Sequence, residues 1–469
     1  MKFRWGTIVM MMLMIVLYCE RRHGSGKELA DYSHLSAPVA PEWARRGVLY
    51  QVFPRVFTHQ GTFRALEEKL DEIQKLDVDI IWLLPIYPIG EKGRKGTLGS
   101  PFSVRDFHKV NPELGTEADF RHLVQEIHRR GLKVIIGMVP NHASNDNVLM
   151  KEHPDWFMRD AQGHFTREVP EWSDITDFNY QNPHLREYMI ETMIYWIREF
   201  DIDGYRCDVA GMVPLDFWKE AIPRLRAVKS DLYLLAEWED PQLLVAGFNS
   251  DYDWTLYHLL KEIREGKKEA HHAAHLIAEK DARYPRNALP MRFLENHDEQ
   301  RALAVFGSEA IQVYATFIFT VPGIPLIYAG QEIGERQKPG LFDKSELNWA
   351  EPDTALRSMY RELIRLRKSY DCFTEGRFHE LPTNVPASLS AFARVGQNSA
   401  AVVVCNFASR TVVNTHVRIP DSVRQNLADF QMVRIDDPAD TLNVRTGETG
   451  NLLPFSAKVY VGRRNSKSR

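Results

Sequence analysis

Short hydrophobic runs alternate with amphipathic segments from about residue 45 onward. The run "GVLYQVFPRVF" at 47–57 is followed by "FRALEEKLDEIQKLDV" at 63–78, where apolar residues recur every three or four positions. The first pattern is typical of a buried strand, and the second of a helix that packs through one face. Repetition of this pair of patterns predicts βαβ units and a parallel sheet.

Eight segments of the chain have strand patterns, and each is followed by a helical pattern. They are residues 47–57, 79–88, 132–142, 201–210, 231–240, 248–254, 290–299 and 324–332, of which 248–254 ("FNSDYDW") is the weakest. Eight such units over 45–375 predict an α/β protein with a (β/α)8 TIM barrel. An open doubly wound sheet is the alternative, but it would be expected to carry a glycine-rich phosphate turn after its first strand, and none is present.

Two stretches break the regular alternation. Residues 143–183 are irregular, aromatic and charged, and a loop of this length inside a compact domain is usually functional. After residue 376 the chain changes to short alternating runs such as "LSAFARV" and "SAAVVVCNFA". These runs predict a separate C-terminal domain over 376–465, a small antiparallel β-sandwich.

Composition excludes few functions. The 469-residue chain is 44% hydrophobic and 26% charged, which is ordinary for a globular protein. Its net charge of -4 gives no reason to expect nucleic acid as a partner, because non-specific phosphate binding needs a basic face. The oligomeric state stays open.

The first 30 residues differ from the rest. Lys2 and Arg4 precede an apolar run at 5–18, and Cys19 follows it directly. The run is shorter than the ~20 residues that span a bilayer, so a cleaved secretory signal is favoured over a lipid anchor at Cys19 or an uncleaved anchor. All three alternatives predict an exported protein that is secreted, periplasmic or attached to a membrane through its N-terminus.

Polar residues stand at the ends of four predicted strands. In "DGYRCDVAG" at 203–211, Arg206 and Asp208 face the same side of one strand, as a buried ion pair or as a catalytic carboxylate held by an arginine. The corresponding strand ends carry Asn141, His142, Glu237, Asn296, His297 and Asp298. Catalytic groups of a TIM barrel lie at this end of the strands, so we expect these side chains to meet.

Two kinds of chemistry fit this set. A metal site is the rival interpretation, but there is no His-x-x-x-His pair, and neighbouring side chains of "ENHD" point to opposite faces of a strand. Two carboxylates that flank a bond, one a nucleophile and one a protonated acid, are the apparatus of retaining glycoside hydrolysis. Arg206 would then hold Asp208 ionised and aimed, because a nearby positive charge favours the charged form.

The segments "GMVPNH", "GYRCDVAG", "LLAEW" and "ENHD", in this order and spacing, resemble the four signature regions of the α-amylase family (glycoside hydrolase family 13). The resemblance extends from residue 45 to about 465. It implies a catalytic barrel, a B domain inserted at 143–183 and a C-terminal β-domain.

The resemblance also implies roles for individual residues. Asp208 would be the nucleophile, Glu237 the general acid/base and Asp298 a carboxylate that stabilises the transition state. The expected sugar-binding residues are His142, Arg206, His297, Phe102 and Arg301. Phe102 stands where the family has a stacking tyrosine, so the ring face is kept and the hydroxyl is lost.

Departures from the family pattern concern a supporting carboxylate and calcium. Gly137 stands where the first region normally begins with aspartate, and the lysine and histidine that often follow the nucleophile are replaced by "GMV". Asn141, a candidate metal ligand, remains. The resemblance therefore implies that no cofactor is required, and it allows Ca²⁺ at Asn141.

The leading expectation is a hydrolase of α-1,4-linked glucans or maltooligosaccharides. An α-1,6-glucosidase or a glucosyl transferase of the same family is the first alternative, since hydrolysis and transfer differ only in whether water or a sugar attacks the intermediate. A non-catalytic, amylase-like membrane partner is the second alternative. It is disfavoured because all three carboxylates are present.

Overall fold

A closed barrel of parallel strands forms the centre of the molecule. The computed structural model describes residues 30–464, and within them eight strands pair in the order β8-β7-β6-β3-β2-β1-β10-β9. A parallel bridge between Tyr252 and Met291 joins the two ends of this sheet. The strands are β1 (Leu49–Val52), β2 (Ile80–Leu83), β3 (Lys133–Met138), β6 (Gly204–Cys207), β7 (Tyr233–Ala236), β8 (Ser250–Asp251), β9 (Met291–Arg292) and β10 (Ile324–Tyr328). The predicted (β/α)8 barrel is confirmed.

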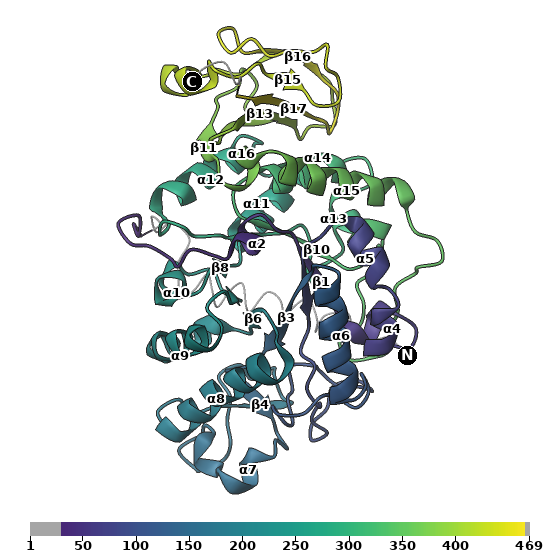
Figure 1. Cartoon of the computed structure of the whole chain (residues 1–469), viewed down its shortest axis with the longest axis vertical. Coiled ribbons are helices and arrows are strands. Elements are labelled where there is room, and N and C mark those ends of the chain that lie inside the picture. The colour runs from purple at the N-terminus through teal and green to yellow at the C-terminus, as the bar shows by residue number, and fades with distance from the viewer. Residues whose placement is uncertain (1–29, 465–469) are drawn as a thin grey trace.

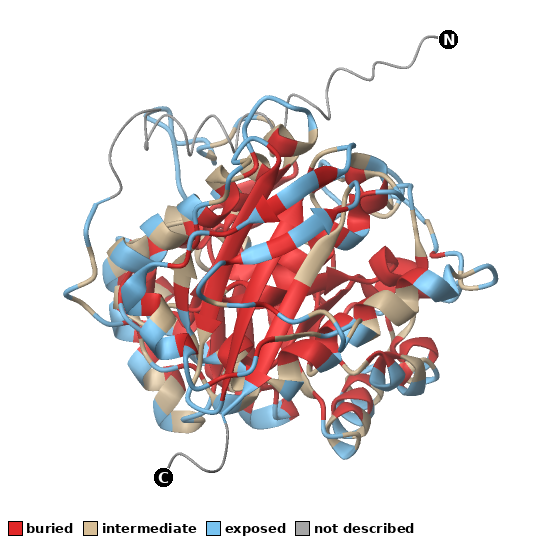
Figure 2. Cartoon of the chain, turned by 90° about the horizontal axis from the view of Figure 1, so that it is seen from above, coloured by how far each residue is buried: buried red, intermediate tan, exposed pale blue. Residues whose placement is uncertain are grey.

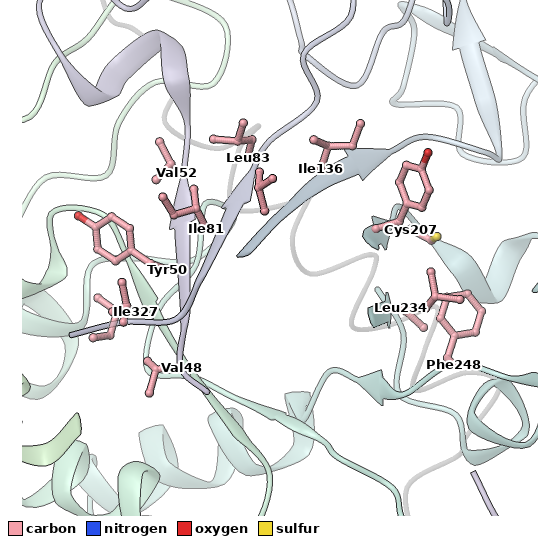
Figure 3. Packing of buried hydrophobic residues seen from close by; sticks show 14 of the residues in the cluster. Val48, Tyr50, Val52, Ile81, Leu83, Ile136, Cys207, Leu234, Phe248 and Ile327 are labelled. Atoms are coloured by element: carbon pink, nitrogen blue, oxygen red, sulfur yellow. The ribbon is translucent and has the colours of Figure 1, made fainter. Parts of the chain in front are cut away.

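Alternation along each strand divides the apolar side chains into two layers. Leu49, Trp82 and Leu235 belong to a cluster inside the barrel. Their neighbours Tyr50 and Leu234 belong to a second cluster between the sheet and the helices (Figure 3). Figure 2 shows that buried residues are concentrated in strands and exposed ones on the outer faces of the helices. A polar side chain inside the barrel is therefore surrounded by buried apolar side chains.

Helices cover the outside of the barrel, as the periodicity predicts. The capping box between Thr116 and Asp119 fixes the start of α6, because each side chain accepts a hydrogen bond from the other residue's backbone N–H. The helices are α2 (Glu42–Arg45), α3 (Pro54–Phe57), α4 (Phe63–Glu67), α5 (Leu70–Leu76), α6 (Glu117–Arg129), α8 (Pro183–Phe200), α9 (Leu215–Val228), α10 (Pro241–Ala246), α11 (Trp254–Arg264), α12 (His272–Arg283), α13 (Ala302–Phe306), α14 (Ile311–Thr320), α15 (Thr354–Ser369) and α16 (Asp371–Thr374).

The long segment after β3 forms a small domain of its own at one end of the molecule (Figure 1). Strand β4 (His142–Ser144) pairs antiparallel with β5 (Ile175–Asp177), and between them lie α7 (Leu149–Glu152) and the short 3-10 helix η1 (Pro154–Trp156). We refer to residues 143–183 as the B domain. Because β4 begins at His142, only a few residues after β3 ends, the insertion starts at the mouth of the barrel.

The C-terminal segment folds into antiparallel sheets at the opposite end (Figure 1). A five-stranded sheet has the order β11-β12-β13-β17-β15, and β14 pairs with β16. These strands are β11 (Arg377–Glu380), β12 (Leu389–Val395), β13 (Ser399–Asn406), β14 (Val412–His416), β15 (Val433–Arg434), β16 (Glu448–Leu452) and β17 (Ala457–Arg463). The helix α17 (Asp421–Leu427), which the strand pattern did not predict, follows β14.

The predicted N-terminal signal or anchor falls on residues 1–29, outside the described part of the chain. Export therefore stays a prediction. Among residues 30–464, none of the helices has the length and apolar character needed to cross a bilayer.

Candidate active site

The predicted polar residues meet at the carboxyl ends of the barrel strands. Asp208 follows β6 directly, and its backbone N–H donates to the carbonyl of Met138 at the end of β3 (2.8 Å). Glu237 follows β7, and its N–H donates to the carbonyl of Cys207 (3.0 Å). Asp298 lies in the turn after β9, where Asn296 Oδ1 accepts from its N–H (2.8 Å). Backbone pairing between adjacent strands thus sets the positions of Asp208 and Glu237, and a side-chain contact within the turn sets that of Asp298.

Arg206 connects two of these carboxylates. Its side chain is fully buried, forms an ion pair with Asp208 through Nη1, and contacts Glu237 Oε1 through Nη2 (2.5 Å). Its Nε donates to the hydroxyl of Tyr252 (3.1 Å). The expected pairing of Arg206 with Asp208 is present, and the pairing with Glu237 was not anticipated. Because one guanidinium contacts both carboxylates, the two acidic groups lie close together.

Gly137 faces this arginine on the adjacent strand, where the family normally has aspartate. Gly137 is the register partner of Arg206. A Cβ at Gly137 would lie 2.8 Å from Cδ of Pro85, so a larger side chain has no room. The Tyr252 hydroxyl and Glu237 therefore supply polar contacts to the guanidinium.

Glu237 differs in environment from an ordinary glutamate. Burial, together with the negative charges of Asp208 and Asp298, raises the pKa of Glu237 to about 8, although Arg206 and the Val209 N–H oppose this shift. The Val209 N–H donates to Glu237 Oε2 (2.7 Å). Val209 adopts a left-handed conformation with φ 36°, which is rare for a β-branched residue and costs on the order of 1–3 kcal/mol. The strained turn after Asp208 thereby directs the Val209 N–H toward the carboxyl group of Glu237.

The two histidines border Asp208 and Asp298. His142 Nε2 lies 3.9 Å from Asp208 Oδ2, and His297 Nε2 lies 3.3 Å from Asp298 Oδ2. The ring of Phe102 stacks on His297 with a centroid separation of 5.4 Å. Burial lowers the pKa of His297 to about 4, so this ring is neutral at physiological pH. The side chain of Asp298 is 36% exposed, which leaves the site open to a ligand.

Arg301 lies apart from these groups. Its side chain is fully buried, and its Nη1 donates to Glu295 Oε1 (2.6 Å) and to the carbonyl of Ala329 (3.0 Å). These contacts hold the turn after β9 against the end of β10. These contacts within the protein stabilise the fold, and a contact between Arg301 and sugar stays a prediction.

Asn141, the candidate calcium ligand, contacts a carboxylate of the B domain. Asn141 Nδ2 donates to Asp177 Oδ1 (3.3 Å), and Asp177 Oδ2 accepts from the backbone N–H of Glu168 (2.6 Å). Ca²⁺ takes six to eight oxygen ligands, and its binding at Asn141 stays a prediction. Across residues 30–464, the one group of three His, Cys, Asp or Glu side chains close enough to share a metal ion is Glu269, His271 and His272, at the start of α12.

Several residues at the site were missed by sequence reasoning. Gln51 Nε2 lies 2.8 Å from Nδ1 of His297, Lys338 Nζ donates to the carbonyl of Asp298, and the ring of Trp172 lies 5.4 Å from that of His142. Gln51 offered a signal, since it is a polar residue inside the apolar strand "LYQV". Lys338 and Trp172 lie on loops far away in sequence and offered none.

Comparison with known proteins agrees with this geometry. The family model of the α-amylase catalytic domain matches residues 51–174 and 155–371. The chain belongs to the α-amylase family. It is 30% identical over 387 residues to the α-amylase MalA of Haloarcula japonica, covering 79% of this chain and 56% of that protein. The chain therefore spans little more than half the length of this relative.

Two solved structures of α-amylase family members have the same fold along almost their whole length. A noncanonic maltogenic α-amylase, AmyB, from Thermotoga neapolitana superposes with a TM-score of 0.82 at 32% identity, covering 90% of this chain and 99% of that one. An α-amylase from Lactobacillus plantarum superposes with a TM-score of 0.80 at 31% identity, covering 89% and 99%. The barrel, the inserted segment and the C-terminal sheets thus belong to one family architecture.

Proposed function

We propose that the protein is a retaining α-glycoside hydrolase of α-1,4-linked glucans and maltooligosaccharides. Asp208 attacks the anomeric carbon, Glu237 protonates the leaving oxygen and then activates water, and Asp298 stabilises the positively charged transition state. The observation that carries the proposal is the single arginine, Arg206, that pairs with both Asp208 and Glu237. A shared guanidinium supports a carboxylate separation of about 5 Å, typical of retaining enzymes, rather than the wider gap of inverting ones.

The different environments of the two carboxylates support a division of roles. Burial keeps Glu237 protonated near neutral pH, as a proton donor requires. Asp208 accepts a hydrogen bond from Arg206 Nη1 and lies beside His142, which is expected to bind a sugar hydroxyl. The names of the relatives, α-amylase and maltogenic α-amylase, support an α-glucan as substrate. A non-catalytic role would leave this arrangement without a use.

The first test replaces the nucleophile. Asp208→Asn keeps the shape of the side chain and removes its negative charge, so we expect at least a 10³-fold loss of kcat on maltoheptaose in a protein that still folds. Asp216→Asn, an exposed aspartate in α9, is the matched control and should keep full activity. Turnover of Asp208→Asn within tenfold of the parent would falsify the assignment.

A second test determines the stereochemistry. Proton NMR of the fresh product should show the α-anomer from an α-linked substrate, because two displacements restore the configuration. A β-anomer as first product would contradict the double-displacement mechanism. Product analysis on maltoheptaose, pullulan and isomaltose then separates α-1,4 hydrolysis from α-1,6 hydrolysis and from glucosyl transfer.

A further inference from the structure

Three loops contact one another beside the candidate active site and are here called the three-loop wall. It consists of residues 95–99 from the loop after β2, residues 171–174 from the B domain and residues 338–343 from the loop after β10. None of these segments carries a proposed catalytic group. Their mutual contacts nevertheless connect one side of the site to the other.

The loops after β2 and β10 are hydrogen-bonded to each other. The backbone N–H of Leu98 donates to the carbonyl of Phe342 (2.9 Å), and the N–H and Oγ1 of Thr97 both donate to Asp343 Oδ1 (2.8 Å each). Arg55, whose side chain is 4% exposed, donates to the carbonyls of Leu98, Gly99 and Leu341 from below. This buried arginine fixes both loops to α3, the short helix that follows β1.

Lys95 joins the same two loops to the B domain. Its Nζ donates to the carbonyl of Glu171 (3.0 Å), pairs with Asp174 Oδ1 (3.1 Å) and lies 5.7 Å from the ring centroid of Phe342. Asp174 is 4% exposed and Lys95 is 21% exposed, so water screens this pair less than an ordinary surface pair. One lysine therefore bridges all three segments.

The two ends of the wall rest on active-site residues. At one end Lys338 Nζ donates to the carbonyl of Asp298. At the other end Trp172, next to Glu171, packs against His142. Phe102, three residues beyond Gly99, stacks on His297 between these ends. These contacts connect the wall to Asp298 at one end and to His142 at the other, with Phe102 between them.

The wall stands on the glycone side of the bond that is cut. A proton donor faces the leaving group, so the aglycone lies toward Glu237 and the adjacent Trp238. The glycone, which is attached to Asp208 after the first step, then lies against Phe102, His297 and Asp298. These residues are the ones that the wall surrounds.

We propose that the three-loop wall closes the glycone side, so that the enzyme cleaves glucans from their non-reducing ends and releases a short product of fixed length. This inference rests on the proposed function and adds a mode of action to it. A chain that continued beyond the glycone sugars would have to pass through the contacts of Lys95, Thr97 and Asp343. Only a chain end fits in front of them.

The test compares two p-nitrophenyl maltoheptaosides that differ at one sugar. One has a free non-reducing end, and in the other an ethylidene group blocks that end. We expect the wild-type enzyme to cleave the free substrate at least 50-fold faster than the blocked one, and to leave β-cyclodextrin, which has no end, uncut. Equal rates on the free and blocked substrates, or rapid opening of β-cyclodextrin, would overturn the inference while leaving hydrolase activity established. Cleavage of neither linear substrate would instead refute the proposed function.

Variants then connect the selectivity to the wall. Lys95→Ala combined with Asp343→Ala removes the bridge to the B domain and both bonds to Thr97, so the ratio of free to blocked rates should fall at least tenfold. Lys75→Ala with Asp160→Ala is the matched control: Lys75 makes an exposed ion pair, and Asp160 Oδ1 accepts from two loop N–H groups (2.9 Å each), both outside the wall. A folded double variant with the wild-type ratio would contradict the assignment, and the wild-type comparison decides the inference if the double variant does not fold.

Discussion

Arg206 holds two acidic residues that are proposed to work in opposite protonation states. Asp208 and Glu237 contact the two ends of the same guanidinium, and only Glu237 receives a hydrogen bond from the strained Val209 N–H. An unpaired buried charge is costly, so these three residues stabilise one another only as a set. A change to any one of them therefore alters the proton affinity of the others.

The raised pKa of Glu237 predicts the basic limb of the pH profile. Below about pH 8 the residue carries its proton and can protonate the leaving oxygen; above that pH it loses the proton, so kcat/KM should fall. Glu237→Gln should cripple cleavage of maltoheptaose, whose leaving alcohol needs a proton, and spare the first step with α-glucosyl fluoride. A pre-steady-state burst of fluoride measures that step. Equal loss on both substrates would mean that another group is the acid.

The same pKa shift predicts a pH-dependent cost to stability. The folded-state pKa of Glu237 lies above its unfolded value, so folding favours the protonated form and stability falls as pH rises from about 4.5 to about 8. Glu237→Gln carries no charge at any pH. Its melting temperature relative to wild type should therefore be higher at pH 8.5 than at pH 5, by calorimetry at constant ionic strength. A difference independent of pH would show that Glu237 titrates normally in the folded protein.

At the scale of elements, the strands were predictable and the loops were not. Apolar runs located all eight barrel strands, including the weak segment 248–254, which contains the two-residue strand β8 and the Tyr252 bridge that closes the barrel. The ends of those strands in turn located Asp208, Glu237 and Asp298. Lys338 and Lys95 could not be found this way, because their contacts join loops 40 and 76 positions apart in sequence and follow no local periodicity.

Close packing of β6 against β7 can be tested at Gly204. Gly204 pairs with Tyr233, and an added Cβ would lie 1.9 Å from the Tyr233 carbonyl oxygen. Gly204→Ala should therefore push the two strands apart, lower the free energy of unfolding by about 3 kcal/mol and reduce kcat, because β6 and β7 carry Asp208 and Glu237. Gly131→Ala is the control, since its Cβ would meet nothing within 4 Å and its positive φ alone costs about 1 kcal/mol. Similar melting temperatures for the two variants would show that the sheet adjusts at Gly204.

At the scale of the whole molecule, calcium dependence concerns how the B domain is held against the barrel. Asn141 and Asp177 satisfy each other across the base of the B domain. A metal bound only to the folded state would raise its stability by mass action, so EDTA should lower the melting temperature of this protein by no more than about 2 °C. Calorimetry with EDTA and with added Ca²⁺ measures this directly. A large loss that Ca²⁺ reverses would show that the B domain does hold an ion.

The barrel and the C-terminal domain are joined by buried arginines, and this junction predicts how the molecule unfolds. Arg394 on β12 is 1% exposed; its Nη1 donates to the carbonyl of Thr320 at the end of α14, and its Nη2 donates to that of Gly376 (2.9 Å each). Arg394→Met fills similar space and leaves both carbonyls without this partner, at a cost of about 1–3 kcal/mol for each buried group. Because Thr320 belongs to the barrel, the contact couples the two domains.

Wild-type protein should therefore unfold in one calorimetric transition, whereas Arg394→Met should show the C-terminal sheets melting first. Arg410→Met, at an exposed position of the same domain, should keep the single transition. One transition in Arg394→Met at a lowered temperature would mean that apolar packing between α14 and β13 couples the domains without the arginine.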